Sequence, residues 1–451
     1  MQAAPMRFLQ VLLLLAIGML AAPGARASVA TDAVRAEIGG IDVVVLKTGA
    51  KDVVTVAGIL PAGDDRSPAG NLAVATLTGA MLDKGTTRQD KFAVAQKLGD
   101  VGASISFSVG SSALQIGAKC LRKDLPLVLS LLAEQLRSPA FSDEEFAKLR
   151  TQLSGSIKQL LEDTDFRAED SYTRAVYPVG HPNRQPAPEE VLAAIERATL
   201  ADVRQFHSQF YGPTGMRLIL VGDVDPQSAQ AEVRKAFAGW NGGSIPPTTA
   251  KAGRVEAPGD QTVFMPEKAN VSVIWGQATQ LQYADPDALA LRIGTRILGS
   301  GFTGRLMANV RDKEGLTYGI GSSVANDTFT DGDWRVQASF APALLEQGLA
   351  STKRQVIAWH DEGVTVAELA RAKSELAGTY KVGLATTSGM AGTILVFLNR
   401  GLPLSFVDEF PRRVEALTLE QVNGAIKRYL DPEQMVLVKA GTVASRVGSA
   451  R

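Results

Sequence analysis

Hydrophobic positions along the chain follow two periods, which separate predicted strands from predicted helices. Short runs rich in β-branched residues, several with alternating polarity, predict strands. These runs are IDVVVLK from Ile41, DVVTVAGIL from Asp52, ASISFSVGS from Ala103, ALQIGAKC from Ala113, VSVIWGQA from Val271, YGIGSSV from Tyr318 and DWRVQASF from Asp333. Longer segments with apolar residues at helical spacing predict helices. They begin at Leu125, Asp143, Ala288 and Leu344.

The order of these elements predicts the fold class. Consecutive strands joined by short turns and followed by long helices favour an α+β arrangement over a strictly alternating parallel sheet. We therefore expect mainly antiparallel sheets, each with helices packed on one face.

Two pairs of similar segments indicate that the chain contains a duplicated unit. FAKLRTQLSGSIK from Phe146 matches LARAKSELAGTYK from Leu369, 223 residues later, and the segment from Thr199 matches that from Thr418, 219 residues later. Nearly equal offsets of this size predict two homologous domains. We place them at residues 28–240 and 254–451, with a Gly- and Pro-rich linker at 241–253.

The first residues have the pattern of a secretory signal peptide. Arg7 precedes an apolar run from Phe8 to Leu20, and Ala25-Arg26-Ala27 suits cleavage before Ser28. Residues 1–27 are therefore predicted to be removed on export. We expect no stable membrane span elsewhere, because no later stretch of comparable length lacks charges.

Composition narrows the classes of function. Lys+Arg and Asp+Glu both number 47, so the zero net charge gives no support to a nucleic-acid partner. Cys120 is the single cysteine, so no disulfide forms within the chain, and a buried structural thiol is the expectation.

Three histidines follow the signal segment, and none has the spacing of a metal site on one helix. His181, His207 and His360 lie far apart in sequence, so an i, i+4 zinc pair cannot be written from them. His181 lies in YPVGHPNRQP, where the prolines predict a loop. We expect a loop-packing or surface role for His181, and packing within helices for His207 and His360.

The segment GSGFTGRLMANVRDKEGLTYGIGSS from Gly299 carries the candidate chemistry. Arg311 precedes Tyr318 by seven residues, with Gly315 between a short helical pattern and the predicted strand. A guanidinium and a phenol on either side of a tight turn can both donate hydrogen bonds to one carbonyl oxygen. The segment lacks a nucleophile that could attack that carbonyl.

Ordinary structural roles are the alternative for these residues. Helix-end arginines often cap carbonyls or pair with acids, here Asp312 or Glu314, and strand tyrosines often pack. The G-x-G-x-x-G spacing from Gly299 follows a helical pattern instead of a strand, so it does not predict dinucleotide binding. Its glycines instead allow close approach by a ligand, a peptide or a helix.

The chain resembles the M16 family of zinc metallopeptidases in three features: the motif RLMANVRDKEGLTYGIGSS, the two-domain repeat and the segment YPVGHPNRQP. Its length and single repeat are similar to those of subfamily B. The resemblance implies that Arg311 and Tyr318 bind substrate and stabilise the transition state. It also makes Gly299, Gly301, Gly304, Gly319 and Ser322 candidates for substrate binding.

The family's inverted zinc motif, H-x-x-E-H, is degenerate in this sequence. The residues that precede Met81-Leu82-Asp83-Lys84-Gly85-Thr86 are Thr76-Leu77-Thr78-Gly79-Ala80, so Thr76, Gly79 and Ala80 replace both histidines and the base glutamate. The stretch from Leu149 to Leu161, where the resemblance places the third ligand, holds no acid. We expect no metal on this chain, because these side chains neither bind zinc nor activate its water.

The resemblance therefore implies a non-zinc subunit of a heteromeric peptidase in the periplasm. A zinc-bearing M16 homologue would supply metal, water and base, whereas this chain would supply Arg311, Tyr318 and part of the wall that binds the peptide substrate. Two alternatives stay open. One is a catalytically inert peptide-binding or scaffold homologue, and the other is a self-sufficient hydrolase that uses Ser, Cys or another metal site.

Overall fold

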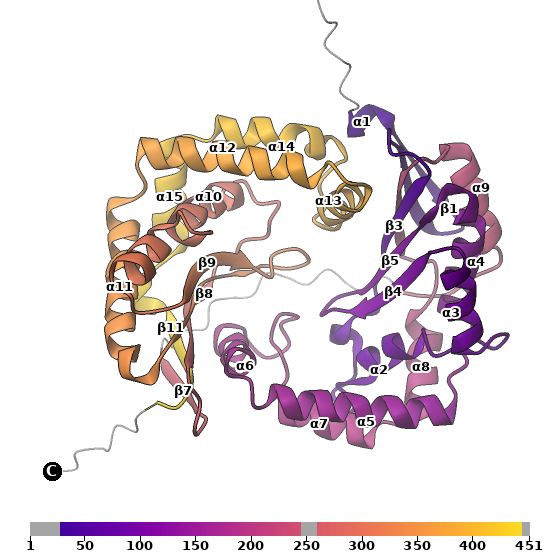
Figure 1. Ribbon diagram of the computed structural model, residues 1–451, viewed down its shortest axis with the longest axis horizontal. Coiled ribbons are helices and arrows are strands. Elements are labelled where there is room, and N and C mark those ends of the chain that lie inside the picture. Colours follow the sequence, from indigo (N-terminus) through magenta and orange to yellow (C-terminus); the bar gives the residue numbers. More distant parts are fainter. Residues whose placement is uncertain (1–27, 245–258, 444–451) are drawn as a thin grey trace, which may run out of the picture.

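The computed structural model describes residues 28–244 and 259–443. The predicted signal peptide at 1–27 and most of the predicted linker, from 245 onward, lie outside the described residues. The described chain contains two sheets, one in each half, with helices around them (Figure 1).

The first half contains a six-stranded sheet in the order β1-β2-β6-β3-β5-β4. The strands are β1 Ala33–Ile38, β2 Ile41–Lys47, β3 Val53–Leu60, β4 Ser104–Val109, β5 Leu114–Leu121 and β6 Arg217–Gly222. β2 and β6 run parallel, and every other neighbouring pair is antiparallel. The sheet is therefore mixed and mainly antiparallel.

The second half repeats this topology in a five-stranded sheet, β7-β11-β8-β10-β9. The strands are β7 Asp260–Phe264, β8 Val271–Ala278, β9 Gly319–Ala325, β10 Asp333–Phe340 and β11 Val436–Gly441. β7 and β11 form the one parallel pair. The order matches β2-β6-β3-β5-β4 of the first sheet, which agrees with the duplication predicted from the sequence.

The helices also correspond between the halves. Those of the first half are α1 Val29–Asp32, α2 Val74–Met81, α3 Lys91–Asp100, α4 Leu125–Arg137, α5 Asp143–Leu160, α6 Thr164–Val176, α7 Pro188–Arg197, α8 Leu200–Phe210 and α9 Pro226–Ala236. Those of the second are α10 Ala288–Gly299, α11 Leu345–Glu362, α12 Val366–Gly383, α13 Thr387–Asn399, α14 Ser405–Ala416 and α15 Leu419–Tyr429. The strands and helices predicted from periodicity are confirmed, with ends shifted by a few residues.

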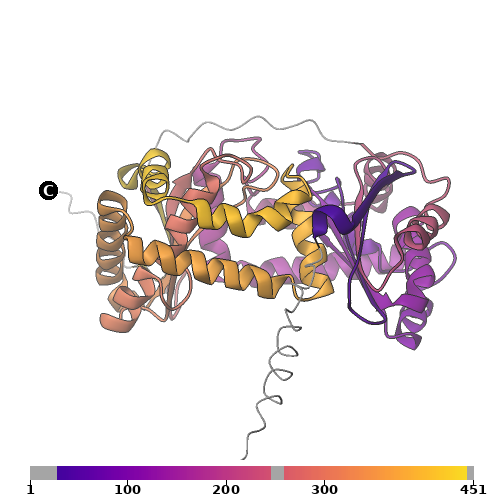
Figure 2. The ribbon, with the colours of Figure 1, turned by 90° about the horizontal axis from the view of Figure 1, so that it is seen from above.

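The central strands of each sheet are buried on both faces, because the two halves exchange a helix. Alternate residues of β8 and β11 enter different cores: Val273 and Trp275 pack with the helices of their own half, whereas Ile274 and Val438 pack with α6 of the first half. Reciprocally, α13 of the second half packs on β3 and β6. The predicted arrangement, with helices on one face of each sheet, therefore holds for the helices of the same half. A helix from the other half covers the second face of the sheet. Figure 2 shows the orange and yellow helices of the second half reaching the first.

Polar contacts reinforce the exchanged helices. The hydroxyl of Tyr172 on α6 donates to the carbonyl of Trp334 on β10 at 3.1 Å, and the Tyr177 hydroxyl donates to Asp333 Oδ1 at 2.7 Å. At α13, Thr387 Oγ1 lies 2.9 Å from Thr55 Oγ1 on β3. These bonds satisfy polar groups at the joint between the halves, which would otherwise oppose burial.

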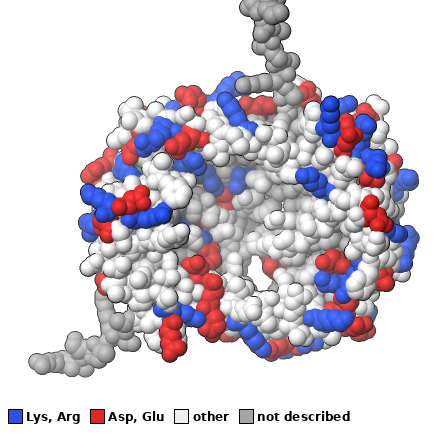
Figure 3. All heavy atoms as spheres, viewed as in Figure 1, with Lys and Arg blue, Asp and Glu red and all other residues white. Residues whose placement is uncertain are grey.

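The surface between the halves is hollowed, and Figure 3 shows positive and negative side chains mixed over the same face.

Among the described helices, none is by itself long and apolar enough to span a membrane. Only α12 and α13 meet that criterion as a pair, and they are bent by 114° relative to each other.

Candidate functional site

The predicted short helix before Tyr318 is a turn of π-helix, Met307–Lys313, that carries Arg311 near its end. Its N–H groups reach back further than in an α-helix, and the N–H of Glu314 donates to the Asn309 carbonyl at 3.0 Å. The Asn309 side chain donates to Gln355 Oε1 on α11 at 3.1 Å, which fixes the turn to its neighbour. Such widened turns are frequent at functional sites, because they redirect side chains from the regular helical path.

Arg311 and Tyr318 lie side by side. The guanidinium carbon of Arg311 is 5.2 Å from the centre of the Tyr318 ring, within the range of a cation–π contact. Tyr318 is 88% exposed, directly before the edge strand β9. Neither the Arg311 guanidinium nor the Tyr318 hydroxyl makes a hydrogen bond with any described residue, and the nearest acid, Asp312, is an ion-pair neighbour at 3.9 Å.

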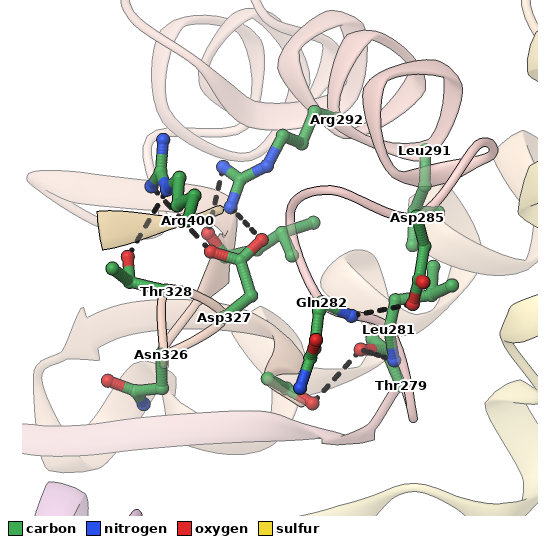
Figure 4. Close-up of polar contacts among 12 residues, drawn as sticks. Thr279, Leu281, Gln282, Asp285, Leu291, Arg292, Asn326, Asp327, Thr328 and Arg400 are labelled. Carbon is green, nitrogen blue, oxygen red and sulfur yellow. Dashed lines mark hydrogen bonds and ion pairs between the residues drawn. The ribbon is translucent and has the colours of Figure 1, made fainter. Parts of the chain in front are cut away.

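Hydrogen bonds and ion pairs anchor β9, the strand that follows Tyr318, near both ends of the strand. Beside Tyr318, Thr317 Oγ1 donates to the Ser339 carbonyl of β10 at 2.5 Å. At the far end, the buried Asp327 pairs with Arg292 and lies 3.7 Å from Arg400, whose Nε donates to Thr328 Oγ1 at 3.2 Å (Figure 4). Tyr318 thus precedes a strand anchored by buried charge pairs.

Three of the predicted substrate-binding residues pack against neighbouring backbone. A Cβ atom on Gly299 would come within 2.4 Å of the Ser322 nitrogen, and one on Gly304 within 3.0 Å of the Gly299 Cα. The hydroxyl of Ser322 donates to the Thr295 carbonyl at 2.9 Å. These residues let α10 approach β9 closely, which agrees with the interpretation that the glycines serve helix packing.

The other two glycines are open to their surroundings. Gly301 has φ +68°, a left-handed conformation that favours glycine, and a Cβ atom added to Gly301 or to Gly319 would have nothing within 4 Å. They lie next in sequence to Phe302 and Tyr318, the two aromatic residues whose rings contact Arg311. These two glycines therefore stay candidates for close approach by a ligand.

The degenerate zinc motif lies on α2, where packing fills the positions of the missing groups. A Cβ on Gly79, the position of the base glutamate, would come within 2.3 Å of Val109 Cγ2 and 3.8 Å of the Tyr211 hydroxyl. Thr76 Oγ1 donates to Asp64 Oδ1 at 2.8 Å, and Ala80 packs against the core of the first half. These residues do not fit a zinc ion, since they offer neither imidazole nor carboxylate from the helix.

Burial shapes the electrostatics beneath α2. Desolvation raises the pKa of Asp64 to about 6, against a smaller opposing effect of the Thr76 hydrogen bond. Burial and the nearby Asp64 raise the pKa of Tyr211 above its ordinary value. The Tyr211 hydroxyl has no hydrogen-bond partner among the described residues. Desolvation therefore dominates the electrostatics beneath α2.

Across residues 28–244 and 259–443, no group of three or more His, Cys, Asp or Glu side chains is arranged to hold a metal ion. Each histidine has a structural contact. His181 accepts from the Asn183 N–H at Nδ1, so its Nε2 carries the proton that faces Asp331 at 3.0 Å. His207 and His360 place Nε2 at 2.8 and 3.1 Å from backbone carbonyls.

Cys120 is buried, and desolvation raises the pKa of its thiol to about 12, so little thiolate forms at neutral pH. Cys120 is buried, as predicted, and each histidine makes contacts within the fold.

Sequence reasoning missed Phe302 as part of the site. Its ring lies 5.3 Å from the Arg311 guanidinium carbon and is 73% exposed. The signal was an aromatic residue placed inside a glycine-rich turn, where no core position calls for one. Phe302 precedes Arg311 by nine residues, and this spacing does not predict a contact. The π-helical turn between them brings the two side chains together.

Comparison with protein families matches each half to a separate model. Residues 43–184 match the model described as insulinase (peptidase family M16), and residues 197–376 match the peptidase M16 inactive domain. Together the two ranges cover more than half of the chain.

Individual relatives are named either as a non-peptidase homolog or as zinc proteases. The chain is 22% identical to the non-peptidase homolog YmxG of Helicobacter pylori, over 82% of this chain and 84% of that protein. It is 25% identical to an uncharacterized zinc protease of Streptomyces coelicolor, over 81% and 80%. A crystal structure of a peptidase M16 inactive domain from Pseudomonas fluorescens superposes with a TM-score of 0.84 at 25% identity, covering 91% of this chain and 97% of that one.

The repeated sheet topology, the Arg311 and Tyr318 motif at the start of β9 and the two family matches agree with one another. The chain belongs to the M16 peptidase family, as a member whose described residues lack a zinc site.

Proposed function

We propose that this chain is a non-zinc subunit of a heteromeric, periplasmic M16 peptidase, in which Arg311 and Tyr318 act on a peptide bond cleaved at the zinc of a partner. The observation that carries the proposal is the contrast between the packed helix α2 and the exposed pair, whose hydrogen-bond donors find no described partner. Donors kept unpaired on a rigid turn suit an oxyanion that arrives with the substrate.

In this mechanism the chain provides electrostatic stabilisation only. The Arg311 guanidinium and the Tyr318 hydroxyl would donate hydrogen bonds to the carbonyl oxygen as negative charge develops there. The partner subunit would supply the metal, the attacking water and the base. An extended peptide would pair with the edge of a sheet, a mode of binding that recognises backbone groups.

The test mixes the chain with its zinc-bearing homologue and follows cleavage of a peptide. Arg311→Ala should lower kcat by about 10²- to 10³-fold, the usual cost of one lost oxyanion donor, and Tyr318→Phe should lower it less. Arg122→Ala is the matched control, because Arg122 is an exposed arginine of the first half, paired with Asp223 at 3.5 Å. If neither site variant changes cleavage by the mixture, catalysis in trans is wrong.

A second candidate is an inert peptide-binding or scaffold homologue, favoured by the name of the Helicobacter relative as a non-peptidase homolog. That role predicts that Arg311→Ala weakens assembly or peptide binding without changing kcat. Metal analysis separates both candidates from a self-sufficient hydrolase. The purified chain should carry no stoichiometric zinc and cleave no peptide alone.

A further inference from the structure

Phe302 and Tyr318 both contact the guanidinium of Arg311, although only Tyr318 belongs to the recognised motif. The two ring centres lie 5.3 and 5.2 Å from the guanidinium carbon, and the rings are 73% and 88% exposed. The left-handed Gly301 turns the backbone immediately before Phe302. Phe302 is thus an exposed aromatic ring in cation–π contact with Arg311.

Arg311 has a competing partner in the next residue. Asp312 Oδ1 lies 3.9 Å from Arg311 Nε, which is too far for a hydrogen bond but within reach after a small rotation of the side chain. A paired guanidinium would lose donors that the proposed reaction needs. The attraction between the cation and the two rings opposes that rotation.

We propose that Phe302 is a positioning residue, whose ring holds the Arg311 guanidinium away from Asp312 and oriented toward the substrate carbonyl. This role rests on the proposed function. It explains why an aromatic residue is exposed on a glycine-rich turn, at a site where the two rings are the principal contacts of the arginine. A cation–π contact at an exposed site has a strength that corresponds to about a three- to fivefold change in rate.

The test compares substitutions at Phe302 in the reconstituted complex. Phe302→Leu keeps an apolar side chain without a ring and should lower kcat about three- to fivefold, with KM unchanged. Phe302→Trp keeps the ring and should preserve kcat. Phe92→Leu is the matched control, because Phe92 on α3 is 72% exposed and its ring centre lies 5.2 Å from Lys91 Nζ.

Two further variants show whether Phe302 acts through Arg311. In the Arg311→Ala background, Phe302→Leu should have no additional effect, because coupled residues are not additive. Asp312→Asn removes the competing carboxylate and should restore most of the kcat lost in Phe302→Leu. A role in packing alone would reduce stability or raise KM, and neither added substitution would cancel it.

The outcomes separate this inference from the proposed function. If Arg311→Ala leaves cleavage unchanged, the proposed function is wrong. If Arg311→Ala lowers kcat as expected but Phe302→Leu retains the natural kcat, or causes the same further loss in the Arg311→Ala background, only the positioning role is overturned.

Discussion

The two halves share one topology, but two of their segments differ sharply in packing: α2 in the first half and the turn ahead of β9 in the second. Beneath α2 in the first half, Gly79 lies against Val109 and Tyr211, and the position of the base glutamate is filled. Ahead of β9 in the second half, Arg311 and Tyr318 reach solvent, with hydrogen-bond donors that no described residue uses. One site has been absorbed into the core, whereas the other has been kept open.

The packing around α2, as well as its residue types, is incompatible with zinc ligands there. Neighbouring side chains pack closely against the bare backbone of Gly79, as protein interiors require. Tyr318, in contrast, is 88% exposed, and Arg311 is partly exposed.

The largest expected effect comes from reopening the packed site. Gly79→Glu would force a side chain into the space of Val109 and bury a carboxylate close to Asp64. We expect a loss of about 3 kcal/mol or more in the free energy of unfolding, measured by urea denaturation. If Gly79→Glu were as stable as the natural chain, the space beside Gly79 could hold a glutamate side chain, and the packed-site interpretation would be wrong.

Gly155→Ala is the control for that substitution. Gly155 lies in the helix α5, is exposed, and has nothing within 4 Å of a Cβ. Because alanine favours helix over glycine, this variant should be neutral or more stable by about 0.5 to 1 kcal/mol.

A smaller effect should appear in the pH dependence of stability. The folded pKa of Asp64, about 6, is above the value of 3.8 in an unfolded chain. The folded state therefore binds a proton first, so the contribution of Asp64 to stability is complete below pH 3.8 and is lost as pH rises through 6. Between pH 7.5 and 4.5 we expect a gain of about 2 kcal/mol from this group.

Asp64→Asn should remove that part of the pH dependence. Asp170, whose pKa is also raised to about 6 by burial, titrates in the same range in both proteins, so the difference between them isolates Asp64. Urea denaturation at the two pH values measures it. Parallel pH profiles for the two proteins would contradict a desolvated carboxylate beneath α2.

The smallest effect concerns the anchor of the open site. Arg305, just before the π-helical turn, donates from Nε and Nη2 to the two oxygens of Glu368, each at 2.7 Å. This pairing, with the cap of α12, lowers the pKa of Glu368 to about 2, so its contribution is present above pH 4.5 and lost as pH falls toward 2.

Arg305→Met should cost about 1 kcal/mol at pH 7, because solvent screens this partly exposed pair, and less at pH 3. The substitution leaves the capping box of Thr365 and Glu368 in place. Thermal unfolding at both pH values measures the difference. An equal loss at pH 7 and pH 3 would mean that packing, not charge, holds the turn.

Much of the fold was predictable because the information is local. The alternation in segments such as that of β5 and the helical spacing in α4 or α5 reflect contacts within one element and its own sheet. The duplication was visible because both copies keep similar helices and turns. The missing zinc ligands could be named from residue types alone.

The exchange of α6 and α13 was not predictable in the same way. Its sequence mark is the nearly continuous apolar run in β8, which indicates a strand buried on both faces but not the helix that covers the second face. That helix comes from the other half of the chain. Residues so far apart in the sequence can contact each other without producing a periodic pattern of hydrophobic positions.

The sequence by itself determined the duplicated α+β organisation, the Arg311 and Tyr318 motif and the absence of zinc ligands on α2, since these depend on residue identity and short-range order. Only the tertiary structure decided that Gly79 is closed by Val109, that the halves cover each other's sheets and that Phe302 contacts Arg311. The physical reason is that packing joins residues by shape in three dimensions, whereas periodicity records only the environment of a single element.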